Sequence, residues 1–427
     1  MEATPRSNRL HIAICGRRNA GKSSLINALT NQEIAMVSTV PGTTTDPVYK
    51  AMEILPVGPV MLVDTAGIDD TGELGSLRVK RSYDVLSTAD MVVLVIDAAT
   101  GVTSYERELA GRCRADGLPL IVVLNKTDLI GTSADRVAEI MRELDIDPVP
   151  VSTKTGQGIN KLKLALIEKA PDHWDEQPIV GDLLNAGDTA VLVAPIDKAA
   201  PKGRLILPQV QTIRDVLDHR GMAYVVTDEE LPACLTGLAP RPKIVITDSQ
   251  VFGKVDQATP KDILLTSFSI LFARQKGDLT TLVAGAGMIR HLEPGDKVLI
   301  AEACTHHRVE DDIGSVKIPR WLTHYVGGNL DFRWSSGRGF PEDLAEYKLV
   351  IHCGACMLTR REMLGRLAEV QAAGVPVVNY GVCIAYLHGI LARALSPFPD
   401  LKERFDIGNH TGGRSQTPMP QGGITNE

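Results

Sequence analysis

One short segment, "GRRNAGKS" at residues 16–23, constrains the fold of this chain more than any other. It fits the pattern G-x-x-x-x-G-K-[ST], follows the apolar run "LHIAIC" and precedes "SSLINALT", so it predicts a strand, a loop and a helix in that order. The backbone N–H groups of such a loop bind phosphate oxygens, its lysine reaches the β and γ phosphates, and its serine hydroxyl binds Mg²⁺. The predicted phosphate-binding residues are Gly16, Asn19, Ala20, Gly21, Lys22, Ser23 and Ser24.

Two further segments complete the predicted phosphate site. "DTAG", which begins at Asp64, ends the strand-like run "VMLV". Asp64 would hold the magnesium shell, and the Gly67 N–H would meet the γ-phosphate. "PGTTTD" lies between the first helix and DTAG, where a mobile switch belongs, and Thr44 is expected to close on Mg²⁺ and the γ-phosphate. The predicted catalytic residues are Lys22, Thr44, Asp64 and Gly67.

The segments "NKTD" and "STK" predict which base is bound. Asp128 can accept both the ring N–H and the exocyclic amino group of guanine, a pair of donors that adenine lacks, so the site selects GTP. Asn125 would bind the base edge and the adjoining loop, and the stem of Lys126 would cover the ring. A backbone N–H of the second segment would reach the guanine oxygen; its residues are Ser152, Thr153 and Lys154.

Strand-like and helix-like runs alternate along nearly the whole chain, which is typical of α/β folds with mainly parallel sheets. We expect three α/β domains and a disordered tail. The predicted ranges are 1–172 for a P-loop small GTPase fold, 178–264 for a second domain, 265–408 for a third domain and 409–427 for the tail. Two helices are expected to end at glycine, one at Gly221 and one at Gly374.

Composition narrows the classes of partner. The net charge of -7 argues against a protein whose main task is to grip nucleic acid. The longest purely apolar runs, such as "MVVLVI", are too short to span a bilayer, and "MEATPRSNRL" has no signal-peptide pattern. Seven cysteines in 427 residues favour free or metal-bound thiols in a reducing compartment. We therefore expect a cytoplasmic protein that binds neither nucleic acid nor membrane.

Two segments of the predicted third domain gather cysteine and histidine. "ACTHH" places Cys304 and His306 after the strand-like run "KVLIAEA", and "IHCGAC" places His352, Cys353 and Cys356 at the end of "YKLVI". Ligands gather beyond the carboxyl ends of parallel strands, so all five side chains converge if the two strands are near neighbours. Three thiolates and an exchangeable ligand suit a [4Fe–4S] cluster, but Cys₃His is also a zinc set. The residues alone leave the metal open.

The nucleotide motifs resemble those of translation-factor-type GTPases, and within them the Era and tRNA-modification (MnmE-like) group. Ile68 follows DTAG at the place where Ras-like proteins keep the glutamine that orients the attacking water. Asn19 matches the loop asparagine with which potassium-activated members of that group bind a monovalent cation, although it could instead bond the loop itself. The resemblance implies slow intrinsic GTP hydrolysis that depends on Mg²⁺ and is stimulated by K⁺.

C-x-H, a long spacer and H-C-x-x-C behind a GTPase domain resemble the HydF family of maturation GTPases for iron-only (FeFe) hydrogenases. "APIDKAAPKGRLILPQVQTIRD" and "KIPRWL" also look like that family, and the resemblance covers essentially the whole chain. It implies a [4Fe–4S] cluster on Cys304, Cys353 and Cys356 with an exchangeable fourth ligand. His306 and His352 are the candidate histidine ligands.

The same resemblance implies a function and partners. The chain would be a GTP-hydrolysing scaffold that assembles the two-iron subcluster and transfers it to apo FeFe-hydrogenase. The two radical-SAM maturases would be transient partners, and the second domain would form a homodimer. One alternative is a ribosome- or tRNA-associated GTPase with a structural zinc domain, which the acidic balance and 4% aromatic residues disfavour. A cluster-dependent redox or radical enzyme is the other, but it predicts a C-x₃-C-x₂-C triad that is not evident.

Overall fold

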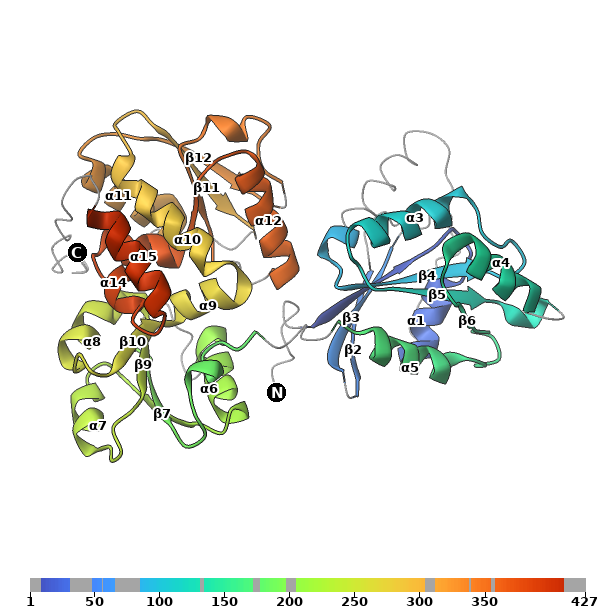
Figure 1. Ribbon diagram of the computed structural model, residues 1–427, viewed down its shortest axis with the longest axis horizontal. Coiled ribbons are helices and arrows are strands. Elements are labelled where there is room, and N and C mark those ends of the chain that lie inside the picture. Colours follow the sequence, from blue (N-terminus) through green and yellow to red (C-terminus); the bar gives the residue numbers. More distant parts are fainter. Residues whose placement is uncertain are drawn as a thin grey trace. The chain divides into compact units, whose positions relative to one another are not determined.

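The computed structural model divides the chain into two compact units, residues 1–176 and 177–427 (Figure 1). The described residues are 9–30, 48–55, 57–65, 85–130, 134–171, 177–196, 205–303, 312–337, 339–354 and 358–410. Five of the predicted site residues lie outside these ranges: Thr44, Gly67, Cys304, His306 and Cys356.

A six-stranded sheet with strand order β2-β3-β1-β4-β5-β6 forms the centre of the first unit. β2 pairs antiparallel with β3, and the other described pairs are parallel. The elements are β1 (Leu10–Cys15), α1 (Lys22–Thr30), β2 (Val48–Ile54), β3 (Gly58–Asp64), β4 (Met91–Asp97), α3 (Ser104–Ala115), β5 (Leu120–Asn125), α4 (Ala134–Leu144), β6 (Val149–Pro150) and α5 (Ile159–Lys169).

Helices cover both faces of this sheet. Ile12 and Ile14 of β1 enter a core shared with α1 and α5, while Ala13 and Cys15 enter a core shared with α3 and α4. Successive side chains of a strand point to opposite faces, so a strand buried on both sides is apolar at nearly every position. This explains why β1 reads as the nearly continuous apolar run "LHIAIC", in which His11 is a buried polar residue. Figure 1 shows α1 and α5 on one side of the sheet and α3 and α4 on the other.

The second unit contains two parallel four-stranded sheets, with orders β10-β9-β7-β8 and β12-β11-β13-β14. The elements of the first part are β7 (Thr189–Val193), α6 (Leu207–Asp218), β8 (Met222–Val226), α7 (Leu231–Gly237), β9 (Ile244–Thr247), α8 (Phe252–Ala258), β10 (Leu264–Ser267), α9 (Phe268–Lys276) and α10 (Leu279–Gly287). Those of the second part are β11 (Lys297–Glu302), a π-helical turn (Ile313–Lys317), α11 (Ile318–Val326), β12 (Asp331–Ser336), β13 (Leu349–His352), α12 (Arg360–Ala372), β14 (Val377–Asn379), α13 (Tyr380–Leu387), α14 (Leu391–Ala394) and α15 (Pro399–His410).

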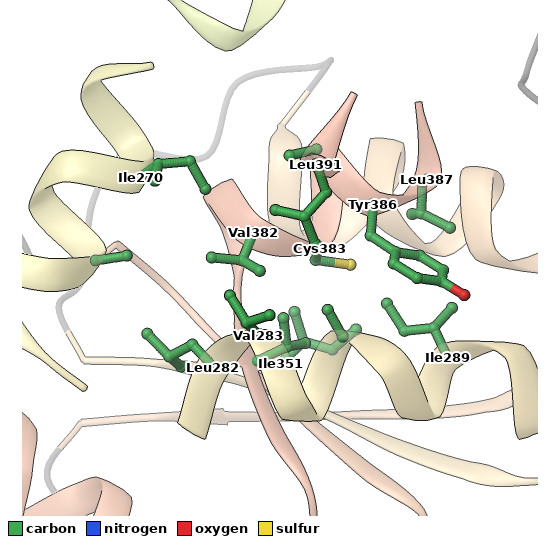
Figure 2. Close-up of a cluster of buried hydrophobic side chains, with 14 of the residues drawn as sticks. Ile270, Leu282, Val283, Ile289, Ile351, Val382, Cys383, Tyr386, Leu387 and Leu391 are labelled. Carbon is green, nitrogen blue, oxygen red and sulfur yellow. The ribbon is translucent and has the colours of Figure 1, made fainter. Parts of the chain in front are cut away.

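One continuous apolar core joins the two sheets of this unit, because Val191 and Val245 of one sheet belong to the same buried cluster as Val298 and Val350 of the other. Figure 2 shows part of this core around α10 and α13, where the sulfur of Cys383 lies among aliphatic and aromatic side chains. Burial raises the pKa of the Cys383 thiol to about 12. No helix in the described ranges is both long enough and apolar enough to cross a bilayer.

The two predicted helix ends differ from each other. α12 ends as expected, because Gly374 has a φ of +74° and the N–H of Val375 bonds the carbonyl oxygen of Val370. The prediction of Gly221 as the cap of α6 is wrong: the left-handed residue there is Arg220, with a φ of +60°. Gly221 is the next residue, and its N–H closes the turn onto Val216. Gly221 also packs closely, since a Cβ there would lie 3.0 Å from a Val216 methyl group.

Candidate functional site

The loop between β1 and α1 carries the predicted phosphate-binding residues. Lys22 is 7% exposed, and its ammonium group donates to the carbonyl oxygens of Gly16 (2.8 Å) and Arg17 (2.9 Å). Asn19 turns the loop with a left-handed φ of +61°. Ala20, in the same loop, is buried. The fold therefore holds a positive charge inside a loop whose backbone can surround a phosphate group.

Ser23 and Asp64 form the candidate magnesium site. Ser23 and its neighbour Ser24 are exposed in the first turn of α1, and the Ser23 hydroxyl donates to Oδ2 of Asp64 at 2.6 Å. The other carboxylate oxygen, Oδ1, is buried and has no hydrogen-bond partner in the described part of the chain. Burial raises the pKa of Asp64, and the Ser23 hydrogen bond and the Lys22 charge oppose that rise. A hydroxyl and a buried carboxylate oxygen fit Mg²⁺, which binds hard oxygen ligands.

Asn125 is fully buried at the end of β5 and ties two loops together. Its Nδ2 donates to the carbonyl oxygen of Ala20 at 2.9 Å, and its Oδ1 accepts from the Thr153 N–H at 3.3 Å. The phosphate loop and the STK segment are thus joined by one side chain. Gly21 is needed beside it, because a Cβ on Gly21 would lie 2.2 Å from Nδ2 of Asn125. Lys154 is exposed beyond this contact.

The remaining residues predicted to bind the base come together at the same sheet edge. The Ser152 hydroxyl donates to Oδ1 of Asp128 at 2.7 Å, which fixes one oxygen of the carboxylate predicted to select guanine. Lys126 has a φ of +64° and pairs with Asp97 at 2.7 Å. Burial works to raise the pKa of Asp97, but hydrogen bonds from Lys126 and from the Ala99 N–H outweigh it and lower that pKa.

Asp97 was not among the predicted site residues. It is the first polar residue after the apolar run of β4, at the carboxyl end of a parallel strand. That position is the signal that could have identified it, because ligands gather beyond the carboxyl ends of such strands. Its ion pair orients the lysine whose stem is expected to cover the guanine ring.

The second candidate site lies at the carboxyl edge of the sheet built from β11–β14. The five predicted ligands can converge only if the strands before the two cysteine segments are near neighbours. This condition is met, because β11 pairs directly with β13, with Ala301 opposite His352. The Ala303 N–H donates to Sγ of Cys353 at 3.3 Å, across 50 residues of sequence. Cys304 follows Ala303 directly. Cys353 is 4% exposed, and a buried cysteine whose sulfur receives a backbone N–H suits a metal-bound thiolate.

His352 is 1% exposed, and both of its ring nitrogens have partners within the chain. Nδ1 lies 2.8 Å from the carbonyl oxygen of Cys353, and Nε2 accepts from Nε of Arg366 at 2.7 Å. Burial and then the charge of Arg366 lower the pKa of His352 to about 4. In the described ranges no three metal-binding side chains gather, and three of the five predicted ligands lie outside those ranges.

Two polar side chains beside this edge escaped the sequence prediction. Glu302 is 6% exposed at the end of β11, and the Tyr380 hydroxyl donates to its Oε1 at 3.2 Å. Burial, followed by the charges of Glu302 and Cys353, raises the pKa of Tyr380. A Cβ on Gly314 would lie 2.1 Å from the Tyr380 hydroxyl oxygen, so the π-helical turn packs closely on this pair. Glu302, like Asp97, is a polar residue at the carboxyl end of an apolar parallel strand, and that position could have identified it from the sequence.

Comparison with known families accounts for both parts of the second unit. The model of the hydrogen maturase F dimerization domain matches residues 179–277, and the model of the hydrogen maturase F tetramerization domain matches residues 280–397. The chain belongs to the hydrogen maturase F (HydF) family. The HydF dimerization match includes the sheet with β7–β10, and the HydF tetramerization match includes the sheet with Cys353 at its edge.

A third family model, described as a 50S ribosome-binding GTPase, matches residues 11–126. Curated relatives of this part are tRNA modification GTPases MnmE. That of Paraburkholderia xenovorans (strain LB400) is 38% identical over 162 residues, which is 38% of this chain and 34% of the relative. That of Dechloromonas aromatica (strain RCB) is 35% identical over 172 residues, 40% of this chain and 37% of the relative. This HydF-family chain therefore spans about a third of their length.

Two solved structures similar to part of this chain are an Era variant and a FeoB G domain. Aquifex aeolicus Era bound to GDP and AlF₄⁻ is 20% identical and covers 51% of this chain and 94% of its own, with a TM-score of 0.35. The G domain of T. maritima FeoB is 25% identical and covers 38% of this chain and 99% of its own, with a TM-score of 0.29. The first unit of this HydF-family chain is a P-loop GTPase domain.

Proposed function

We propose that this chain is a GTP-hydrolysing scaffold that binds a [4Fe–4S] cluster, assembles the two-iron subcluster of FeFe-hydrogenase and transfers it to the apo-hydrogenase. Membership of the HydF family and the GTPase domain support this proposal. The observation that carries the cluster part is the Ala303 N–H directed at the Cys353 sulfur, because it brings the residue before Cys304 to the second cysteine segment.

In the GTPase part, the described residues bind and orient the nucleotide. Lys22 would leave the loop carbonyl oxygens for the β and γ phosphates, and Ser23 and Asp64 would hold Mg²⁺. Thr44 and Gly67 are proposed to close on the γ-phosphate, and Asn19 to bind K⁺. Ile68 offers no side-chain group to orient the attacking water, so intrinsic hydrolysis would be slow.

In the cluster part, Cys304, Cys353 and Cys356 are the proposed thiolate ligands. A [4Fe–4S] cluster held by three thiolates offers its fourth iron to an exchangeable ligand. The chain fixes the Cys353 sulfur with a backbone N–H and shields it from water, since the residue is 4% exposed. Ordering of the switch segments by GTP would change how the apo-hydrogenase and the two radical-SAM maturases dock.

Self-association is proposed to use the exposed edge strand β8. This strand lies at one end of its sheet, and Met222, Tyr224 and Val225 are each 44% exposed. An edge strand presents N–H and C=O groups that a second strand can pair with. A second copy of β8 would pair with this strand edge to edge and form a homodimer, with Met222 and Tyr224 on one face of the joined sheet and Val225 on the other. The dimerization-domain match at residues 179–277 supports this assignment.

One experiment separates the proposed cluster from the zinc alternative. The full-length chain would be purified without oxygen and analysed for iron, sulfide and zinc, with EPR after reduction. We expect about four iron atoms per chain, and loss of the EPR signal in Cys353→Ser. The buried thiol Cys383→Ser is the matched control and should keep the signal. One zinc without iron would refute the cluster assignment.

A second experiment tests the link between GTP and maturation. In Lys22→Ala, hydrolysis should be lost because the ammonium group that reaches the phosphates is gone. Activation of apo-hydrogenase and release of partners should then slow as well. Unchanged maturation in this variant would mean that hydrolysis has no part in the transfer.

A further inference from the structure

Arg366 is a buried cation on a helix whose other buried residues are apolar. It is 5% exposed on α12, where the remaining buried side chains are Met363, Leu367 and Val370. Arginine is almost never buried without partners, because its charge cannot be removed by deprotonation. Its position in the core therefore depends on the groups that face it.

Three groups around Arg366 belong to the edge of the sheet with Cys353. Its Nε donates to Nε2 of His352 at 2.7 Å, and its Nη1 donates to the carbonyl oxygen of Gly337 at 3.1 Å. Its guanidinium carbon lies 4.4 Å from the centre of the Phe340 ring, within the range of a cation–π contact. These groups come from β13 and from the segment that follows β12, so Arg366 joins two parts of the edge.

The contact with Arg366 decides how His352 carries its proton. The guanidinium can only donate, so Nε2 of His352 must accept with its lone pair. The ring proton is then on Nδ1, which donates to the carbonyl oxygen of Cys353 at 2.8 Å. Histidines that bind metals use one nitrogen as the ligand and donate from the other. Here the nitrogen that would bind iron is occupied by Arg366, at 2.7 Å.

The charge of Arg366 also acts on Cys353. Arg366 bonds the ring of His352, the residue directly before Cys353, so its charge lies near that cysteine. Burial lowers the pKa of Arg366, and the charges of Cys353, Glu369 and Glu362 oppose that fall. A cluster with three thiolate ligands is negatively charged, and reduction adds one more negative charge. A nearby cation in a dry site therefore favours the reduced form and raises the reduction potential.

We propose that Arg366 is a positioning residue of the cluster site, which keeps Nε2 of His352 away from iron and holds a positive charge beside Cys353. This inference rests on the proposed function, since it needs a cluster bound to Cys353. It also means that His352 supports the cysteine segment through hydrogen bonds and is not itself a ligand of iron. The two effects of Arg366, on the histidine and on the potential, are separately measurable.

The test uses the full-length chain with ¹⁵N-labelled histidine, as wild type and as Arg366→Met and Arg366→Lys. Arg393→Met is the matched control, because Arg393 is also largely buried but pairs with Asp256 and the carbonyl oxygens of Pro260 and Ile263. Imidazole ¹⁵N shifts in the cluster-free chain report the tautomer of His352. The signals of this residue are assigned by their absence from the spectrum of His352→Gln. Redox titration and nitrogen hyperfine spectroscopy of the reconstituted chain report the potential and the ligation.

In the wild type we expect His352 as the Nδ1–H tautomer, with no directly coordinated histidine nitrogen from this residue. Arg366→Met should lower the reduction potential and release His352 into a mixture of tautomers. Arg366→Lys should keep most of the potential, because it keeps the charge, but not the tautomer. Arg393→Met should match the wild type in both measurements.

The two proposals fail in different ways. A wild-type chain that takes up no iron and sulfide would refute the proposed function, and the further inference with it. A wild-type chain that binds the cluster with His352 directly coupled would overturn the further inference alone. Equal potentials in Arg366→Met and Arg393→Met would do the same. If Arg366→Met does not fold, Arg366→Lys and His352→Gln decide the question, because His352→Gln should leave the hyperfine spectrum unchanged.

Discussion

Gly21 and Asn125 should be energetically coupled, because one contact depends on both. Asn125 is fully buried and joins the phosphate loop to the STK segment through two hydrogen bonds. A Cβ on Gly21 would lie 2.2 Å from the Asn125 amide nitrogen, so Gly21→Ala must displace that amide. The same contact is removed outright in Asn125→Ala. The two substitutions therefore damage the nucleotide site through a shared step.

The size of the coupling follows from the contacts. Asn125→Ala leaves a carbonyl oxygen and an N–H without their buried partner, at a cost of about 2–4 kcal/mol. Gly21→Ala should lose about 2 kcal/mol of the same bonds, and it adds roughly 1–3 kcal/mol of strain because φ is +96°. In the Asn125→Ala background only the strain remains. The expected coupling energy is about 2 kcal/mol, which is roughly a 30-fold effect on affinity.

The assay is the affinity of the full-length chain for a fluorescent GDP analogue with Mg²⁺, measured for the wild type, both single variants and the double variant. Far-UV circular dichroism would check that each variant is folded. The double variant should bind about 30-fold more tightly than the sum of the single losses predicts. Losses that add to within about 0.5 kcal/mol would refute the reasoning, because distant sites behave in that way.

Three further predictions concern other parts of the molecule. The Cys383→Val variant should be destabilised less by alkaline pH than the wild type. The folded thiol has a pKa of about 12, against an ordinary value of 9.0. Its contribution to the free energy of unfolding is therefore present below pH 9 and is lost as the pH rises toward 12. Urea unfolding should show the wild type losing roughly 1.4 kcal/mol per pH unit relative to the variant above pH 9, and parallel pH curves would contradict this. Asp64→Asn should weaken Mg²⁺-dependent GTP binding by at least about tenfold, since it removes the negative charge from a buried carboxylate next to Ser23. Isothermal titration with and without Mg²⁺ checks this, with Asp135→Asn, an exposed carboxylate on α4, as the control. Tyr224→Lys should shift the chain toward monomer in analytical ultracentrifugation, because it places a charge on the exposed face of β8; an unchanged sedimentation coefficient would place the dimer contact elsewhere.

The sequence alone was sufficient for the features that depend on neighbouring residues. The phosphate loop, its lysine and the apolar strand before it lie within one short segment, so their order along the chain fixes their geometry. Continuous apolar runs marked the strands buried on both faces, such as β1 and β4. The glycine that closes α12 was likewise predictable, because Gly374 takes up a left-handed conformation at the end of a helical pattern.

Other features required the tertiary structure, because they join residues far apart in the chain. The pattern of "KVLIAEA" and "YKLVIH" predicted two strands but did not order them, and their direct pairing appears only in the folded sheet. Arg366 could be noticed as an arginine at a buried helical position, but its contact with His352 comes from packing α12 onto the edge of β13. The sequence pattern predicts Gly221 as the cap, but in the folded chain Arg220 has the left-handed conformation, and Gly221 packs closely against Val216.

There is a physical reason why some features could be predicted from the sequence and others only from the tertiary structure. Backbone conformation and periodic burial are set mainly by interactions between residues a few positions apart, and these are written directly in the sequence. Strand order and side-chain contacts between elements arise when whole surfaces pack, and the energy of each contact depends on partners that the chain brings together only on folding. The phosphate loop belongs to the first kind. The placement of Ala303, His352 and Arg366 around Cys353 belongs to the second.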